Sequence, residues 1–336
     1  MKKSFLSILF LALASFAAAQ SVQLDSLMVQ VRGDYVYEDI DGHHLKDASG
    51  FKGKYFNFIL RTRIGEHFVF NYRQRLNKSS LNANYFDATD WLYLDYHPTE
   101  QWTLSAGKQI VAIGGYEYDK APIDVYYASE YWNNINPYEW GVSATFGLRS
   151  GKDRFTAQFC QSPFRRAGED TYAYNLLWSG RHGCWSPLWS LNAIEYAQGR
   201  FIGYAVFGNA FDLGRFRLEL DLMNRAVKGQ RPLLRDCSVM GELTYKASDR
   251  LSILAKGTYD VNRSHHEGDR CVMPGTEISH VGAGVEYFPL RNRTLRLHAD
   301  AAYTFGSNGN PEGTLQDKHT LVNCGLTWYV NLRKIK

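Results

Sequence analysis

The sequence lacks any long apolar run beyond its first residues. A mostly apolar segment covers Phe5–Ala14, and no later stretch approaches the roughly 20 apolar residues that a membrane-spanning helix requires. The mean hydropathy of the whole chain is −0.36. Membrane-spanning helices are therefore excluded, while the average alone fits both a secreted soluble β-protein and a β-barrel of which half of each strand faces water.

The chain also has little net charge and few motifs for chemistry. Removing Lys2 and Lys3 lowers the formal charge from +4 to +2, so no basic excess predicts nucleic-acid binding. There is no GxSxG, no glycine-rich phosphate loop and no HExxH, and the run His265–Asp269 lacks metal-site spacing. These absences predict no enzyme, no metal and no cofactor. The five cysteines are scattered without CxxC spacing, which leaves one disulfide between loop cysteines open: Cys160, Cys184, Cys237, Cys271 and Cys324.

The N-terminus has the order of a secretory signal. Lys2 and Lys3 precede the apolar segment, and the small residues Ala17–Ala19 follow it. We expect residues 1–19 to be a signal peptide cut between Ala19 and Gln20. The mature protein would then be a single domain over residues 20–336.

Alternating apolar and polar residues recur along the mature chain, and this pattern is typical of β-strands with one apolar and one polar face. Leu295, Leu297 and Ala299, for example, alternate with Arg296 and His298. Aromatic residues make up 15% of the chain, which suits the aromatic girdles of a membrane barrel. The pattern predicts about sixteen strands, at 27–38, 53–64, 68–77, 88–97, 101–111, 139–149, 153–161, 171–179, 187–197, 200–211, 214–224, 236–247, 250–262, 276–288, 293–305 and 319–332. The alternation is weakest from the eighth to the tenth.

The connections between these strands alternate in length. Short turns at 65–67, 97–100, 150–152, 212–214, 248–249 and 289–292 lie between longer loops near 39–52, 78–87, 112–138, 225–235, 263–275 and 306–318. This rhythm predicts an all-β, transmembrane antiparallel barrel with short periplasmic turns and long extracellular loops. Because strand edges in lipid would lack hydrogen-bond partners, the first and last strands must pair. About sixteen strands enclose a lumen wide enough for water.

Four arginines lie on the polar faces of the second and third strands: Arg61, Arg63, Arg73 and Arg75. If Ile64 pairs with Phe68 across the short turn, Arg61 faces Asn71, and the four guanidinium groups gather on one sector of the lumen. Such a row would line the pore and attract anions. The alternative is a set of ordinary lumenal charges paired with carboxylates.

The longest connection, residues 112–137, is the candidate constriction loop. It carries five charged residues and many aromatic ones, so we expect it to pack against the barrel rather than extend into water. Folded into the lumen, its acids would oppose the arginines; the alternative is a loop packed over the barrel rim. The charged residues are Glu117, Asp119, Lys120, Asp124 and Glu130.

Several segments resemble the phosphate-selective porin O and P family. They are Ala106–Gln109, Ile113–Tyr118, Pro122–Tyr126, Tyr131–Asn134, Pro137–Val142 and Gln161–Phe164. The resemblance implies a sixteen-stranded outer-membrane barrel, usually a homotrimer, through which small anions diffuse. It also implies basic residues at the constriction, although the arginines named above come from the alternation and not from the family.

These observations favour a passive diffusion porin of a Gram-negative outer membrane, surrounded by lipid and passing small hydrophilic solutes, with phosphate-like anions among the candidates. Two other functions stay open. One is a structural or adhesive barrel that binds a partner through its long loops. The other is an outer-membrane hydrolase whose serine, histidine and acid are brought together by folding.

Overall fold

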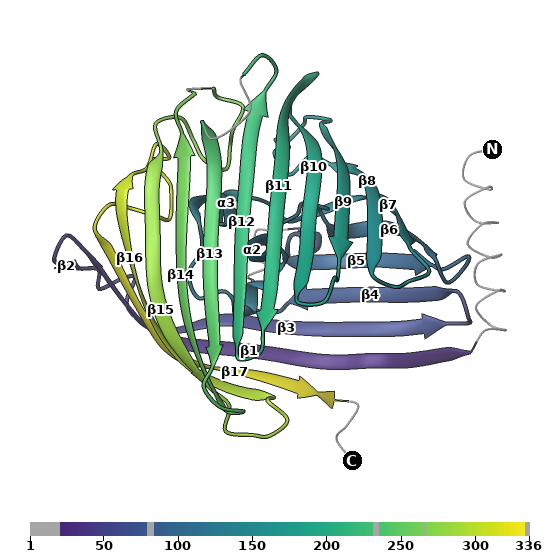
Figure 1. Ribbon diagram of the computed structural model, residues 1–336, viewed down its shortest axis with the longest axis horizontal. Coiled ribbons are helices and arrows are strands. Elements are labelled where there is room, and N and C mark those ends of the chain that lie inside the picture. The colour runs from purple at the N-terminus through teal and green to yellow at the C-terminus, as the bar shows by residue number, and fades with distance from the viewer. Residues whose placement is uncertain (1–20, 79–83, 231–234, 265, 333–336) are drawn as a thin grey trace.

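The computed structural model describes residues 21–78, 84–230, 235–264 and 266–332. The predicted signal peptide, with its cleavage site between Ala19 and Gln20, lies outside these residues. Nearly all regular structure belongs to one antiparallel sheet (Figure 1). No helix in the described ranges is long and apolar enough to cross a membrane.

The sheet contains sixteen long strands, and a two-residue strand, β2 (His43–His44), extends the first loop. Each long strand overlaps the range predicted for it. The long strands are β1 (Val22–Ile40), β3 (Gly50–Ile64), β4 (Phe68–Arg75), β5 (Thr89–Tyr96), β6 (Trp102–Ile110), β7 (Tyr138–Gly147), β8 (Asp153–Gln161), β9 (Tyr172–Gly180), β10 (Trp185–Ala197), β11 (Arg200–Leu213), β12 (Phe216–Val227), β13 (Asp236–Lys246), β14 (Leu251–Asn262), β15 (Glu277–Tyr287), β16 (Leu295–Ser307) and β17 (His319–Asn331).

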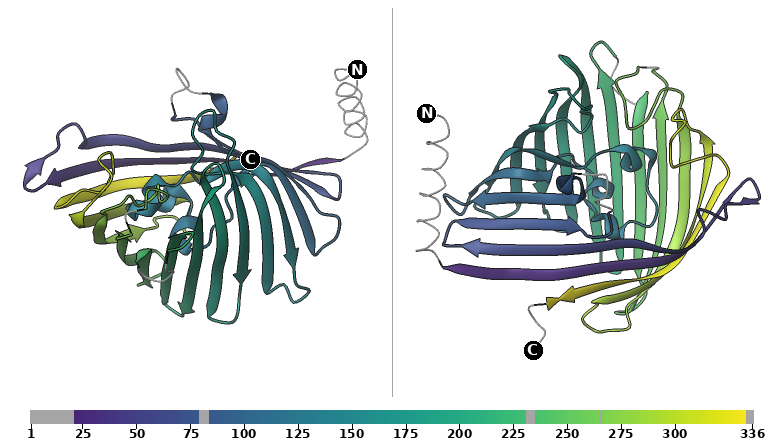
Figure 2. Two further views of the ribbon diagram at one scale, coloured as in Figure 1. Left: turned by 90° about the horizontal axis from the view of Figure 1, so that it is seen from above. Right: turned by 180° about the vertical axis from the view of Figure 1, so that it is seen from behind.

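The sheet closes into a barrel, as predicted. Strand β1 pairs with β3 on one side and with β17 on the other, in a register that runs from Met28 opposite Asn331 to Ile40 opposite His319. The views in Figure 2 show the sheet curving round until the yellow C-terminal strand lies beside the purple N-terminal strand. Closure gives every long strand a hydrogen-bonded neighbour on both sides, whereas an open edge in lipid would leave N–H and C=O groups without partners.

Side-chain burial follows the predicted alternation. In β16, Leu297 is 42% exposed on the outer face, whereas the neighbouring His298 is 3% exposed and faces the lumen. In β17, Cys324 and Trp328 are exposed on the outer face. All five cysteines are free thiols, so the disulfide left open by the sequence is absent from this structure.

Short turns and long loops lie at opposite ends of the barrel, which we call the turn end and the loop end. One connection departs from the predicted rhythm, because β10 and β11 are joined at the loop end by Gln198 and Gly199 alone. Gly199 has a φ of 69°, a conformation that favours glycine in so tight a turn.

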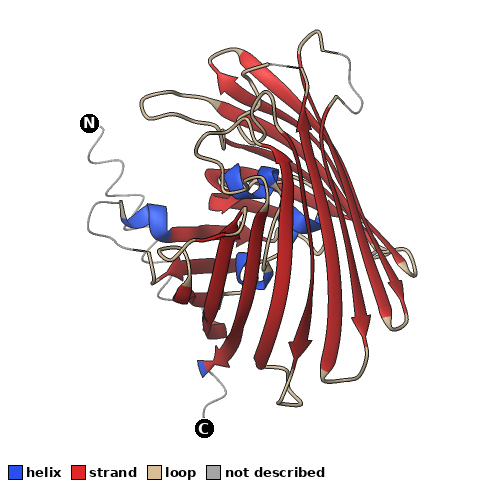
Figure 3. Cartoon of the chain, turned by 90° about the vertical axis from the view of Figure 1, so that its left-hand side faces the viewer, coloured by secondary structure: helices blue, strands red, loops and turns tan. Residues whose placement is uncertain are grey.

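The third loop, residues 112–137, lies inside the barrel and not over its rim. It contains two short helices, α2 (Tyr116–Asp119) and α3 (Glu130–Asn134), and a 3-10 turn, η2 (Pro122–Asp124). Figures 1 and 3 show these helical segments between the walls of the barrel. The alternative of a rim loop is therefore wrong.

The start of the third loop lies directly against the inner wall. The backbone N–H of Gly114 donates to Ser190 Oγ at 2.8 Å, and that of Gly115 donates to the carbonyl of Leu188 at 3.1 Å. A Cβ atom on Gly208 would lie 2.8 Å from the Cα of Gly115. Glycine is required there because the loop backbone and the strand backbone are in contact.

We expect Gly208→Ala to destabilise the folded barrel by about 1–3 kcal/mol, because the added methyl group must push the third loop off the wall. The free energy of unfolding by urea in detergent micelles measures this. Gly203→Ala, in the same strand, is the control, since a Cβ there meets nothing closer than 3.5 Å. Equal destabilisation by the two variants would contradict the close approach.

Candidate functional site

Two carboxylates of the far wall, which we define as β12–β16, hold the helices of the third loop. Asp221 on β12 accepts hydrogen bonds from the backbone N–H groups of Tyr116 and Glu117, both at 2.8 Å. Asp260 on β14 accepts one from the N–H of Glu130 at 2.8 Å. These N–H groups belong to the first residues of α2 and α3 and have no partner within the helix. Each carboxylate therefore acts as an N-terminal cap supplied by the barrel.

Ion pairs fix the same loop to the same wall. Glu117 contacts Lys256 at 2.6 Å, and Asp124 contacts Arg296 at 2.9 Å. Burial by itself would raise the pKa of Glu117, but Lys256 and Ser129 outweigh it and hold the pKa below its usual value. Glu117 is therefore a buried carboxylate that stays charged because it is paired.

The predicted opposition between loop acids and arginines is wrong for three of the four acids. Glu117 and Asp124 form ion pairs with residues of the far wall. Glu130 is buried and accepts a hydrogen bond from Asn134 Nδ2 at 2.7 Å. The far wall carries lysine and arginine of its own, and these lie closer to the loop. Asp119 alone among the four lines the cavity that Arg73 also lines.

An apolar core fills the lumen between the third loop and strands β8–β12. Its wall residues include Ile194, Tyr204 and Val206, and Tyr131 of α3 packs against Tyr204 with ring centroids 6.0 Å apart. Residues 269–272, in the connection after β14, fold inward over this core, where Cys271 is fully buried. The lumenal face of β11 is apolar, and that of β10 combines apolar Ile194 with polar Ser190 and Asn192, which explains why the alternation is weak there.

Arg73 and Arg75 share one carboxylate on the opposite side of the lumen. The Nε of Arg73 lies 3.1 Å from Asp90 and the Nε of Arg75 lies 2.8 Å from it. The guanidinium of Arg73 also covers the ring of Trp91 at 4.8 Å from its centroid. A register shift in the pairing of β4 with β5 places Asp90 on the lumenal side, where strict alternation would have pointed it at lipid.

Arg61 and Arg63 lie further toward the turn end. The predicted hairpin register is confirmed, with Ile64 opposite Phe68 and Arg61 opposite Asn71. Arg63 is half exposed and contacts Asp25 at 3.4 Å. Arg61 lines a polar cavity of about 960 Å³ at the turn end, which we call the vestibule. The structure therefore separates the four arginines into two pairs at different depths of the lumen.

A cavity of about 310 Å³ separates Arg73 and Arg75 from the third loop. We call it the eyelet. The barrel contributes Arg73, Arg75 and aromatic side chains from β3, β5 and β7, and the loop contributes Asp119 and Lys120. The aromatic residues that line it are Tyr55, Trp91, Tyr118, Trp132 and Tyr138. The apolar core fills the lumen between the third loop and β8–β12. The eyelet lies on the opposite side of the loop, between the loop and strands β3–β7.

Several of these residues were not predicted from the sequence. Asp90, Asp221 and Asp260 organise the arginines and the loop, but each reads in the sequence as one more polar residue of a strand. Of these, Asp221 and Asp260 fall on predicted polar faces. The alternation therefore places their side chains in the lumen, but it does not identify their hydrogen-bond partners. Across the described part of the chain, no cluster of three or more His, Cys, Asp or Glu side chains is placed to hold a metal ion.

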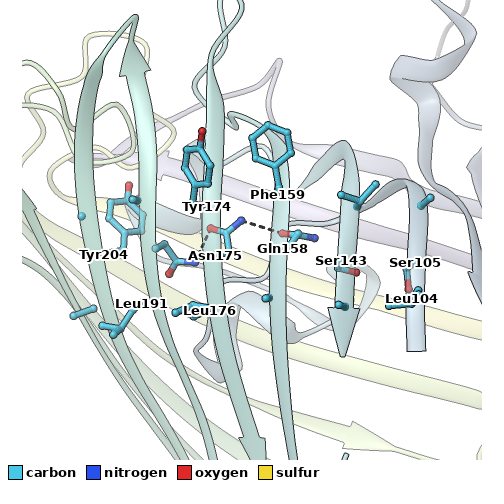
Figure 4. A pocket seen from close by; sticks show the side chains of 18 of the residues that line it. Leu104, Ser105, Ser143, Gln158, Phe159, Tyr174, Asn175, Leu176, Leu191 and Tyr204 are labelled. Carbon is cyan, nitrogen blue, oxygen red and sulfur yellow. Dashed lines mark hydrogen bonds between the residues drawn. The ribbon is translucent and has the colours of Figure 1, made fainter. Parts of the chain in front are cut away.

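The outer wall has an apolar groove of about 1200 Å³ across β5–β12. Figure 4 shows Leu176 and Leu191 in it, with Asn175 on the same wall hydrogen-bonded to Gln158 at 3.0 Å. Small residues make the groove shallow and open to close approach. They are Ala106, Ala144, Ala157, Ala193, Gly203, Ala205 and Ala226.

Solved structures share this architecture. An anion-selective porin from Comamonas acidovorans is 10% identical, with a TM-score of 0.66 over 93% of this chain and 100% of that chain. The outer membrane channel DcaP of Acinetobacter baumannii is 12% identical, with a TM-score of 0.65 over 93% and 98%. OmpT of Vibrio cholerae, in its trimer form, is 14% identical, with a TM-score of 0.59 over 93% and 100%. At sequence identities this low, the structural similarity establishes the fold alone.

Among curated proteins, none matches the sequence. A family model described as phosphate-selective porin O and P matches residues 27–231, which is more than half of the chain and includes the third loop and the arginines. With the closed barrel, this match shows that the chain belongs to the phosphate-selective porin O and P family and is an outer-membrane porin.

Proposed function

We propose that small hydrophilic solutes diffuse passively between the third loop and strands β3–β7, with the eyelet as the narrowest part of their path. The single observation that carries this proposal is the eyelet itself, a cavity lined by charged and aromatic side chains that adjoins both the loop and the arginines. The vestibule gives the path a wide, charged mouth at the turn end. Family and fold point to a channel and not to an enzyme.

Electrostatics supports the passage of anionic groups, phosphate-like anions included. Two guanidinium groups face one carboxylate at Arg73, Arg75 and Asp90, so this side of the eyelet keeps a net positive charge. Arginine suits carboxylate and phosphate because its planar group offers paired donors. The family description, phosphate-selective porin, agrees with this preference.

We further propose that residues 1–19 are removed between Ala19 and Gln20, and that residues 20–336 form the mature barrel. The turn end then faces the periplasm, because short turns mark that side of bacterial barrels. The exposed apolar side chains of the outer face contact outer-membrane lipid.

A homotrimer is proposed with its seam on the outer groove across β5–β12. The groove combines exposed leucines with a row of alanines, which lets a second barrel approach closely. A similar structure, OmpT of Vibrio cholerae, is described in a trimer form, which supports this arrangement.

Reconstituted in a planar bilayer, the protein should give stepwise conductance, and replacing Arg73 and Arg75 with Gln should shift the reversal potential in asymmetric salt toward cations. A unit charge about 6 Å from a permeating ion contributes about 0.7 kcal/mol in water, so losing two lowers anion permeability about tenfold. Arg63→Gln is the control, because this half-exposed arginine lies outside the eyelet. An unchanged reversal potential in the double variant would defeat the assignment.

Replacing Asp221 and Asp260 with Ala should loosen the third loop and widen the eyelet. Both carboxylates hold loop N–H groups, so their loss frees α2 and α3 from the far wall. We expect larger, noisier single-channel currents, with the barrel still resistant to unfolding in detergent. Replacing Asp212, which pairs with Arg217 at the turn end, gives a matched loss of carboxylate that should leave the noise unchanged.

Ala157→Trp with Ala193→Trp should convert a trimer into monomers, because two indoles would fill the groove. Sedimentation in detergent measures the mass of the assembly. Ala301→Trp on the outer face of β16 is the control, since it adds an equal side chain away from the groove. A trimer that survives the double substitution places the seam elsewhere.

A further inference from the structure

The barrel side of the eyelet carries a positive charge and an unused donor. Arg73 is buried, and its Nη2 has no hydrogen-bond partner among the residues described. Only one carboxylate, Asp90, serves both Arg73 and Arg75. The side chain of Arg75 is 18% exposed and can receive a solute carboxylate, while the buried Arg73 beside it adds positive charge.

The loop side carries the opposite charge. Asp119 is exposed to the eyelet and forms no ion pair within the described part of the chain. The neighbouring Lys120 does not cancel it, because its ammonium already lies 2.7 Å from Glu219 and 2.5 Å from Glu242. Glu219 also pairs with Arg217 at 2.8 Å, so these cations are engaged by carboxylates other than Asp119. The eyelet therefore has a transverse field, positive at the arginines and negative at the loop.

Aromatic side chains occupy the space between these charges. Tyr55, Trp91 and Tyr138 come from the barrel, and Trp132 comes from α3. The rings of Trp91 and Tyr138 are 6.3 Å apart and lie edge to face. Tyr138 is buried, whereas Trp91 and Trp132 are partly exposed, and partly exposed rings bind flat apolar groups by stacking or edge contacts.

We propose that the eyelet favours zwitterionic solutes that carry an aromatic ring, the class of aromatic amino acids and short peptides containing them. The solute carboxylate faces Arg73 and Arg75, its ammonium faces Asp119, and its ring lies against Trp132 or Trp91. A simple anion gains the first contact but is repelled by Asp119, and a simple cation is repelled by the arginines. This inference rests on the proposed diffusion function and specifies its solute.

Three solutes that share one ring test the charge requirement. Phenylalanine carries both charges, phenylpropionate lacks the ammonium, and phenethylammonium lacks the carboxylate. Initial uptake of each labelled solute into proteoliposomes is measured in symmetric KCl, with valinomycin holding the membrane potential at zero. We expect phenylalanine to enter about threefold faster than either analogue, the effect of one charge at about 6 Å in water.

Single substitutions then assign each charge. Asp119→Asn should lower phenylalanine uptake, raise phenylpropionate uptake and so abolish the preference between them. Arg75→Gln, which leaves the pairing of Arg73 with Asp90 in place, should abolish the preference for phenylalanine over phenethylammonium. Trp132→Leu should reduce the preference for phenylalanine over leucine while leaving the charge preference intact.

Arg61→Gln is the matched control, because Arg61 lines the vestibule and not the eyelet, and it should change none of these ratios. Uptake of phenylalanine no faster than of both analogues, or an Asp119→Asn variant with unchanged ratios, overturns the inference. Conductance in KCl separates this failure from a failure of the diffusion function. A barrel that conducts but shows no preference contradicts only the proposed solute class. A barrel that does not conduct contradicts both proposals.

Discussion

The need to pair every backbone N–H and C=O group in lipid governs this structure. Strand β1 meets β17 along thirteen residue pairs, from Met28 opposite Asn331 to Ile40 opposite His319, so the sheet has no open edge. Closure forces alternate side chains to point outward and inward. The outer residues must then be apolar, while the inner ones are free to carry charge. Charged residues can line the lumen because the closed barrel keeps them away from the lipid.

Within that enclosure, the distribution of partners decides where a solute can pass. The far wall supplies Asp221, Asp260 and Lys256 to hold the third loop, and the apolar core seals the loop against β8–β12. A buried ion pair such as Glu117 with Lys256 is expensive to break, because each charge would remain in a medium of low polarity. The loop therefore stays on that side, and the eyelet lies on the other.

Particular residues show how far sequence reasoning reached. The register of the arginine hairpin followed from a three-residue turn and strict alternation, and Arg61 does lie opposite Asn71. Asp90 could not be placed in this way, because a register shift between β4 and β5 reverses the parity at that position. The destination of the loop acids also depended on Lys256 and Arg296, which lie more than 130 residues away in the chain.

The sequence by itself determined the sixteen strands, their inner and outer faces, the closure of the barrel and the identity of the long aromatic loop. These properties depend on a period of two and on turn spacing, both of which are local. Only the tertiary structure decided that the loop enters the lumen, that it pairs with β12–β16, and that Arg73 and Arg75 face Asp119 across a cavity. Those features depend on contacts between segments that are distant in the sequence. Such contacts form only when the chain has folded, so local patterns cannot identify the paired residues.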